Sequence, residues 1–434
     1  MNIISNTFLK SNQLISYRLG LMQNMVKLPR LNNDPLSIAF GMWPCNTNQL
    51  HGERFEGRSS GCGFDLYGAF MGTIGETVER YCPAFYNKNN MFHGKYIDIS
   101  TQAISPSEYA LFHQKQHAFF QKNNYKMNIF DEDIELYWDK CIDLTSGKEI
   151  YVPAAFIYLP WTIEKKWITV GTSTGLAAHT NYFKAMLTAL YELIERDSFV
   201  ITWHQQIFSH KIIIDNHIQD YITQKFPAEY EWHFFDITYD IKIPTIFGLC
   251  FGEAEYGKFV AVGTACRGTI SEALRKVILE ISQTVSYFRY LLGEKKNWMP
   301  SDDFNQILNF EDHSIFYIKR PEYQNVMNVW REAIPSLQID FQERDEMPIK
   351  ERIKNIINLL KEKGYNVLLR DVTTPDVNQV GFFSLRVIVP QLLQMGGAYP
   401  FYFLGGKRLY EVPTEMGHYS RNYDELNKFP HPFP

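Results

Sequence analysis

Three segments of the sequence repeat one arrangement of side chains that could bind a charged cofactor. Each segment has an alanine, a glutamate seven residues later, and a glutamate or glutamine three residues after that. The three sets are Ala69/Glu76/Glu79, Ala185/Glu192/Glu195 and Ala273/Glu280/Gln283. Spacings of three and seven residues place such side chains on one face of a helix, one and two turns apart. The sequence therefore predicts three helices that each present oxygen-bearing side chains on one side.

Carboxylates that converge on one cavity repel one another unless cations compensate their charge. Mg²⁺ suits such a site because it takes oxygen ligands and shares its coordination sphere with phosphates. The first two helices also carry Arg80 and Arg196 directly after the second glutamate. A guanidinium in this position could bind carboxylate or phosphate. The alternative is a solvated helix face with i,i+4 ion pairs, and the three copies with one alanine offset favour the cofactor site.

Other chemistry has weaker support in the sequence. The P-loop signature G-x-x-x-x-G-K-[ST] is absent, as are the kinase motifs and G-x-S-x-G. Cys62 lies between two glycines and could be a nucleophile, but a buried thiol is the better interpretation because no histidine partner is evident. His179 and His204 flank the second helix, and a structural role is favoured over a catalytic one for both.

The elements that must position these residues alternate between strands and helices, which predicts an α+β (α/β mixed) protein. Helices are expected at about 66–81, 183–206, 270–292 and 348–363. Strands are expected at 134–138, 150–159, 231–236, 244–251, 258–262, 365–371 and 382–389. The second and third helices share a β-rich lead-in that ends in Val-Gly-Thr, at 170–172 and 262–264. Residues 295–345 are expected to be rich in loops, and residues 1–55 give little indication of their secondary structure.

Composition excludes several classes of function. The chain has 434 residues, 43 basic and 48 acidic, with a net charge of −5, so it has no general attraction for nucleic acid or an anionic membrane. No run of about 18 apolar residues occurs, so no membrane span is expected. The six cysteines lack zinc-ligand spacing and are expected to be reduced thiols. A cytoplasmic protein without nucleic-acid or membrane partners is predicted.

The sequence ends in Phe429-Pro-His-Pro-Phe-Pro434. Alternating prolines favour an extended, polyproline-like rod. A rigid tail of this kind could bring its terminal carboxylate to a chosen place, whereas the alternative is a floppy terminus.

Taken together, these segments resemble one protein family. The stretches that resemble the ATP-binding segments of the YcaO family are SSGCGFDLYGAFMGTIGETVERYC, GTSTGLAAHTNYFKAMLTALYELIERDSFVITWHQ and SEALRKVILEISQTVSYFR. The segment DVTTPDVNQVGFFSLRVIVPQLLQM resembles the family's C-terminal strand region, and PHPFP resembles the P-x-P-x-P ending of its azoline-forming members. The resemblance implies an N-terminal segment, 1–58, and a YcaO catalytic domain, 59–434, in which helices and sheets surround a central ATP/Mg site and the tail is 430–434.

The resemblance also implies an activity, an ATP- and Mg²⁺-dependent cyclodehydration of a peptide backbone. Members of this kind add a Cys, Ser or Thr side chain to the preceding amide carbon, phosphorylate the resulting oxygen with ATP, and release phosphate to leave a thiazoline or oxazoline. An amide oxygen is a poor leaving group, and phosphorylation makes it a good one.

Site residues follow from the same resemblance, motif by motif. The residues that match Mg²⁺ ligands are Glu76, Glu79, Glu192 and Glu195. Those that match positions around the nucleotide are Arg80, Thr180, Lys184, Arg196, Glu280, Gln283 and Arg386. Those expected at the reacting peptide are Arg386, Pro432 and Pro434, whose terminal carboxylate would act as base or positioner. The chain departs from the family pattern at Cys62, Gly72, Thr180 and Lys184, where a lysine, a serine, an asparagine and a glutamate are usual.

The implied partners are a ribosomally made precursor peptide and an E1-like or ThiF-like protein that binds its leader. The resemblance covers nearly the whole chain, so no fused peptide-recognition domain is expected. A flavin-dependent azoline dehydrogenase is a further partner that the resemblance allows. Two alternatives stay open: a YcaO-type enzyme that forms thioamides or amidines, and a non-catalytic scaffold of a modifying complex.

Overall fold

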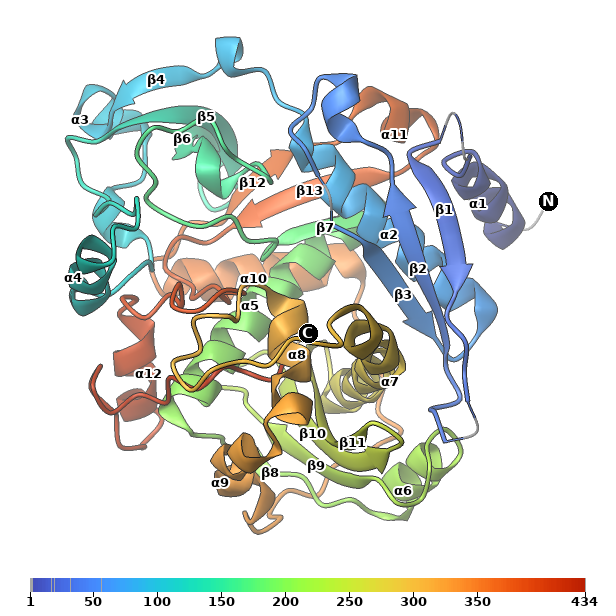
Figure 1. Cartoon of the computed structure of the whole chain (residues 1–434). Helices are drawn as coiled ribbons and strands as arrows, with labels where there is room; N and C mark the ends of the chain where they lie inside the picture. Colours follow the sequence, from blue (N-terminus) through green and yellow to red (C-terminus); the bar gives the residue numbers. More distant parts are fainter. Residues whose placement is uncertain (1–2, 17, 19, 32, 56, 434) are drawn as a thin grey trace.

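The structure is a computed structural model that describes residues 3–16, 18, 20–31, 33–55 and 57–433. Three antiparallel sheets, with helices packed between and around them, make up the described part of the chain (Figure 1). The first sheet has the order β1-β2-β3, with β1 at Met22–Lys27, β2 at Ile38–Pro44 and β3 at Ser59–Gly63. Because β2 pairs with β3 across the predicted boundary at residue 58, the first strands and the first carboxylate helix belong to one packed unit.

The second sheet is built from distant parts of the sequence. Its order is β4-β5-β12-β13-β7, and β6 pairs with β5 outside this path. The strands are β4 (Phe92–Lys95), β5 (Glu135–Asp143), β6 (Lys148–Pro153), β7 (Leu176–His179), β12 (Leu368–Asp371) and β13 (Phe383–Ile388). The central strands β12 and β13 come from the C-terminal quarter, so this sheet joins segments that lie far apart in the sequence.

The third sheet has the order β11-β10-β9-β8. Its strands are β8 (His210–Lys211), β9 (Glu231–Asp236), β10 (Thr245–Ala254) and β11 (Gly257–Cys266). Strands β10 and β11 form a hairpin in register from Thr245 opposite Cys266 to Ala254 opposite Gly257. Gly257 has φ +104, a conformation that L side chains rarely adopt, so glycine suits this hairpin turn.

Three long helices each follow a strand: α2 (Leu66–Tyr81) after β3, α5 (Tyr182–Gln205) after β7, and α7 (Ile270–Glu294) after β11. Each begins at an N-cap side chain that accepts a hydrogen bond from the backbone N–H three residues later. The caps are Asp65, Asn181 and Thr269. Each cap lies four residues before the repeated alanine, which is fully buried in all three helices. The three strand–turn–helix units predicted from the repeat are therefore present, and they share a helix start as well.

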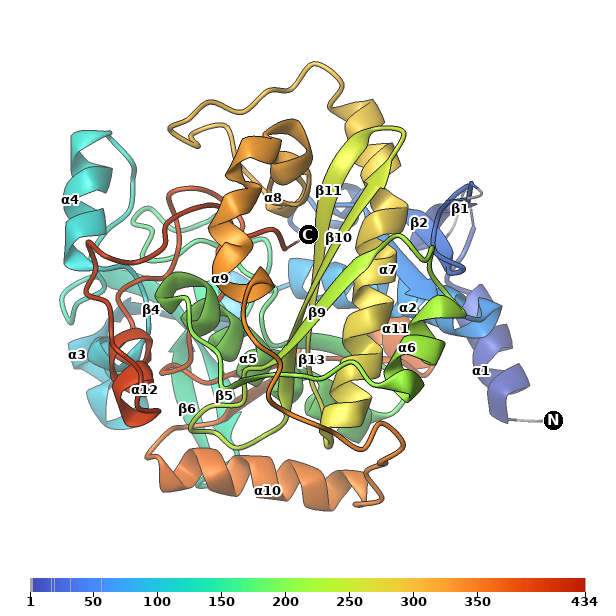
Figure 2. The same cartoon turned by 90° about the horizontal axis from the view of Figure 1, so that it is seen from below.

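The other helices cover the outside of these layers (Figures 1 and 2). They are α1 (Ile3–Asn12), α3 (Tyr96–Ile99), α4 (Gln114–Lys122), α6 (Asn216–Thr223), α8 (Phe310–Lys319), α9 (Asn328–Arg331), α10 (Ile349–Glu362), α11 (Pro375–Gln379) and α12 (Arg408–Glu415). Helix α10 packs against α5 through Ile353, Ile356 and Leu360, as the amphipathic stripe predicts. The tail at residues 430–431 lies against α8, whose Tyr317 and His313 side chains contact its carbonyls.

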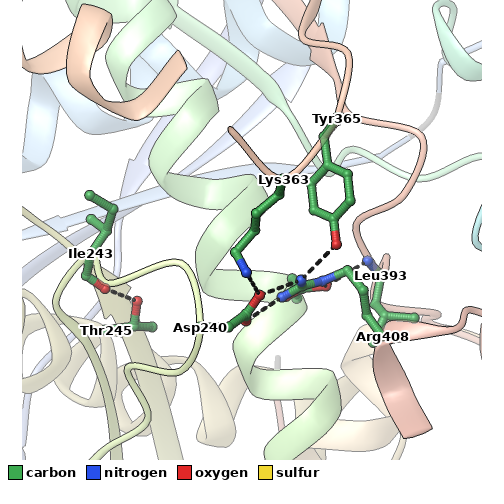
Figure 3. A network of polar contacts seen from close by, with 8 residues as sticks. Asp240, Ile243, Thr245, Lys363, Tyr365, Leu393 and Arg408 are labelled. Carbon is green, nitrogen blue, oxygen red and sulfur yellow. Dashed lines mark hydrogen bonds and ion pairs between the residues drawn. The ribbon is translucent and has the colours of Figure 1, made fainter. Parts of the chain in front are cut away.

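A buried ion network fastens α5 to the C-terminal part of the chain (Figure 3). The guanidinium of Arg408 on α12 donates to both carboxylate oxygens of Asp197 on α5, with contacts of 2.6–3.1 Å. It also donates to both oxygens of Asp240, at 2.8 Å each, and Lys363 binds the same carboxylate at 2.7 Å. The backbone N–H of Leu393 donates to Asp197. Asp197 directly follows the second predicted arginine, so the network anchors the helix that carries it.

Several predictions about elements are wrong, each for a local reason. Residues 170–172 form no strand, and the strand before α5 is β7 at Leu176–His179, where the edge of β13 offers a backbone partner. The strand expected over 150–159 ends at Pro153, and Ala154–Phe156 form a 3₁₀ turn. The segment 295–345 is rich in loops as expected, but it also contains α8 and α9. In the described part of the chain, no helix is long and apolar enough to cross a membrane.

Candidate active site

The predicted acidic residues lie in one cluster formed by α2, α5 and α7. Glu79 pairs with Arg80 at 3.3 Å, and Glu192 pairs with Arg196 at 3.6 Å. Glu192 interacts electrostatically with Arg80 on the neighbouring helix and with Glu280 on α7. The structure thus brings the three repeated segments together, as the spacing predicts.

Hydrogen bonds tie α7 to the other two units on either side of the cluster. On one side, the Gln283 side chain donates to Ser60 Oγ at 3.0 Å, and the Ser60 backbone N–H donates to Glu76 at 2.8 Å. On the other side, Thr264 Oγ1 donates to Glu195 at 2.9 Å, and the Thr264 backbone N–H donates to Glu280 at 3.3 Å. Strands β3 and β11 therefore hold the carboxylates in place from behind.

Burial dominates the protonation of these acids. It raises the pKa of Glu79 to about 8, with Glu192 and Glu76 adding to the shift and Arg80 opposing it. It also raises the pKa of Glu195 to about 8, with a further contribution from Glu280. The pKa of Glu76 and that of Glu192 are raised for the same reason, although nearby arginines oppose the shift. A divalent cation among these carboxylates would favour their charged forms.

Arg386 completes the cluster from strand β13. Its side chain is buried, its Nε donates to the carbonyl of Phe156 at 2.7 Å, and its Nη1 has no hydrogen-bond partner among the described residues. Burial lowers the pKa of Arg386 to about 10, while Glu192 opposes the shift. Arg196 also has a buried Nε that meets no partner in the described part of the chain. Such orphaned donors are costly unless a ligand accepts from them, and phosphate oxygens are suitable acceptors.

These residues fit a nucleotide with Mg²⁺. The side chains of Glu79 and Glu192 are recessed but keep 17% and 19% of their surface exposed, so a ligand can reach them. Among the described residues, no three acidic, histidine or cysteine side chains are close enough to chelate a metal by themselves. Mg²⁺ is usually held by one or two carboxylates together with phosphates and water, so an open set of this kind suits it.

Two predicted nucleotide residues, Thr180 and Lys184, lie at the start of α5 and not among the ion pairs. Thr180 contacts His179, and the Lys184 backbone N–H donates to the cap Asn181. The Lys184 side chain is exposed, and eight residues of helix, about 12 Å, separate it from Glu192. Their role at the nucleotide stays a prediction.

The C-terminal segment is buried, which contradicts the floppy alternative. The Tyr317 hydroxyl donates to the carbonyl of Pro430, and His313 Nδ1 contacts the carbonyl of His431 at 2.9 Å. Pro432 is buried, and the Phe433 ring lies 5.1 Å from the guanidinium carbon of Arg196. The tail therefore reaches the cluster, although Pro434 lies outside the described residues.

The structure also shows the positions of the cysteines and of His204, for which the sequence favoured structural roles. All six cysteines are free and buried, and Cys62 lies 4.0 Å from the Ser282 hydroxyl, so the buried-thiol interpretation holds. His204 is buried and its Nδ1 contacts the carbonyl of Asn427, which is a structural role. Sequence reasoning missed Lys276, which pairs with Glu280 at 3.2 Å. Its i,i+4 spacing to that glutamate was the available signal.

The raised carboxyl pKa values predict how stability changes with pH. The pKa of Glu79 and that of Glu195 are ordinarily 4.5 and are raised to about 8 in the folded chain, so between these pH values the folded chain holds protons that the unfolded chain has released. The stabilisation that these protons give is complete below pH 4.5 and is lost as pH rises to about 8. We expect the free energy of unfolding of the ligand-free chain to fall as pH rises from about 5 to about 8. Denaturant unfolding across this range measures it, and Glu195→Gln should flatten the slope. An equal slope in that variant would contradict the assignment.

Comparison with known proteins places this geometry in a family. Residues 60–393 match the family model described as YcaO cyclodehydratase, ATP- and Mg²⁺-binding. A search among curated proteins gives no match. One similar solved structure is a heterocyclase in complex with substrate and cofactor, with TM-score 0.78 and 20% identity over 100% of this chain. The present chain spans only 57% of that heterocyclase.

Two further structures cover nearly the same length as this chain. The YcaO protein from Methanopyrus kandleri, bound with AMPPCP and Mg²⁺, has TM-score 0.61 and 16% identity over 90% of each chain. The E. coli microcin synthetase McbBCD complex matches with TM-score 0.59 and 16% identity, over 88% of this chain and 92% of that one. At these identities the likeness shows a shared fold. With a family model that matches most of its length, the chain belongs to the YcaO cyclodehydratase family, whose members bind ATP and Mg²⁺.

Proposed function

We propose that this chain is an ATP-dependent cyclodehydratase that converts Cys, Ser or Thr residues of a ribosomally made precursor peptide into thiazolines or oxazolines. The observation that carries the proposal is the recessed cluster of carboxylates and arginines, supplied by three strand–helix units of a YcaO fold. A ligand that brings both cations and phosphates would satisfy this mixture of buried acids and orphaned arginine donors.

The roles of the residues follow from their charges. Glu76, Glu79, Glu192 and Glu195 would hold Mg²⁺, and Arg80, Arg196 and Arg386 would bind phosphate oxygens. Bound ATP supplies the phosphoryl group that turns the peptide oxygen into a leaving group. The chain itself holds these side chains at fixed positions, since Ser60 and Thr264 bind the acids from the strand side. It also limits contact with bulk water, because Glu79 and Glu192 keep only 17% and 19% of their side-chain surface exposed.

The substrate and partners belong to the same proposal. The microcin synthetase with the shared fold is a complex, and it is also known with pro-MccB17 bound. Because that synthetase is a complex, we expect a partner protein to capture the leader of the precursor and deliver its core to this chain. The terminal carboxylate of Pro434 would act at the reacting peptide, with Pro432 shaping the tail.

A reconstitution experiment tests the proposal. The purified chain, its leader-binding partner, the precursor and Mg-ATP should yield a peptide that has lost one water for each ring, as read by mass spectrometry. Replacement of oxygen by sulfur in the product would indicate the thioamide alternative and would contradict azoline formation. An unchanged peptide would refute the activity.

The scaffold alternative is tested on the chain alone. Calorimetric titration with Mg-ATP should give saturable binding in the native chain and little or none in Glu76→Gln, because that carboxylate faces the cluster from α2. Heat that is the same in both proteins, or absent in both, would favour a non-catalytic scaffold.

A further inference from the structure

Arg196 lies between two aromatic rings that come from different parts of the chain. Its guanidinium carbon is 5.1 Å from the ring centre of Phe433 in the tail and 5.9 Å from that of Phe310, the first residue of α8. Both distances fall within the range of cation–π contacts. Neither ring was singled out by the repeat or by the family motifs.

Polar contacts alone hold this arginine loosely. Among the described residues, its nearest carboxylate oxygen, on Glu192, is 3.6 Å away, which is longer than a hydrogen bond. Its Nε is buried and has no partner within the described part of the chain, and only 14% of the side chain is exposed. An aromatic face stabilises a cation that is removed from water more than it stabilises a solvent-exposed cation. The two rings therefore help to restrain the plane of the guanidinium.

The rings are themselves fixed. Phe433 packs on Phe199 of α5 with ring centres 5.5 Å apart, and Phe310 lies 5.8 Å from the His431 ring. The imidazoles of His431 and His313 are stacked at 4.0 Å. Because α8 also binds the carbonyls of the tail, helix and tail form one rigid support behind the arginine.

We propose that Phe433 and Phe310 are positioning residues that clamp Arg196 for binding a nucleotide phosphate, so that the tail acts on the nucleotide site through its phenylalanine ring. This inference rests on the proposed function in one respect, the role of Arg196 at ATP. It separates two contributions of the tail, because the ring of Phe433 and the terminal carboxylate of Pro434 can be changed independently.

The experiment is calorimetric titration of single variants with Mg-ATP. Phe433→Leu and Phe310→Leu should each weaken binding on the order of tenfold, because leucine fills space without offering an aromatic face. Phe433→Trp should restore binding. The matched controls are Phe429→Leu in the tail and Phe316→Leu in α8, whose rings contact Phe304 and Tyr323 but not Arg196. They should bind Mg-ATP like the native chain.

A double-mutant cycle separates positioning from general loosening. In an Arg196→Met background, Phe433→Leu should cause no further loss of Mg-ATP affinity, because the clamp has nothing left to hold. The same tenfold loss in both backgrounds, or native affinity in Phe433→Leu, would overturn the clamp. Melting temperatures of all variants show that the chain is folded. A chain that binds Mg-ATP through the clamp but modifies no peptide would keep this inference and refute the proposed function.

Discussion

Replacing Glu192 with glutamine should lower ATP-dependent turnover at least ~100-fold while leaving the protein as stable as before. Glu192 interacts with Arg196, Arg80, Arg386 and Glu280, so it lies at the centre of the cluster. Glutamine keeps the shape of the side chain but removes the charge that a metal ion needs. Burial already raises the pKa of Glu192, which means that its charged form is disfavoured in the folded chain. Loss of that charge should therefore not lower the free energy of unfolding.

Two measurements check this outcome. Turnover is followed as phosphate release in the reconstituted reaction, and stability as denaturant unfolding without ligand. Glu294→Gln is the matched control, because that carboxylate lies on α7, pairs with Arg58 at 3.3 Å and is 53% exposed. It should keep native turnover. An active Glu192→Gln enzyme would remove this carboxylate from the metal site, and a strongly destabilised one would assign it a structural role.

Replacing Arg408 with methionine should cost about 3–5 kcal/mol of unfolding free energy, the largest stability effect that we expect. The arginine is 5% exposed and binds Asp197 and Asp240, which are 1% and 6% exposed. Burial would raise the pKa of Asp240, but Arg408 and Lys363 lower it to about 2, so the carboxylate depends on these cations. Methionine has a similar length and leaves Asp197 buried, with the Leu393 N–H as its remaining hydrogen-bond partner among the described residues.

The stability of this variant is measured by urea unfolding, with a second substitution as the check. Asp197→Asn added to Arg408→Met should recover part of the loss, because it removes the uncompensated charge. As a control, Lys140→Met breaks an exposed pair with Glu149 and should leave stability nearly unchanged. A small effect of Arg408→Met would mean that water or local rearrangement satisfies both aspartates.

The repeated spacing in the sequence was enough to predict the three helices and their convergence. Seven- and three-residue offsets are local properties, and they located Glu76 and Glu192 on inward faces. The caps Asp65, Asn181 and Thr269 carry the same information, since each precedes its alanine by four residues. Helix α8 was predictable too, because Asn309 caps it and two acidic residues follow in its first turn.

What the sequence could not reveal depends on contacts between distant segments. The run at 167–172 has strand composition, yet β7 forms nine residues later because only there does β13 supply hydrogen-bond partners. Mg²⁺ was expected to balance the negative charge of the carboxylates. Arginines on α2, α5 and β13 already balance part of that charge. Likewise, no periodicity links Phe310 to Phe433, whose rings both lie beside Arg196.

The scattered origin of the cluster has a consequence for how the protein forms. Ser60, Glu192, Gln283 and Arg386 are separated by roughly 90 to 130 residues each, so closing the site requires loops of high entropic cost. Secondary structure can therefore form well before any nucleotide affinity appears. During refolding, recovery of Mg-ATP binding should lag behind recovery of helical circular dichroism, which makes nucleotide binding a reporter of complete tertiary assembly.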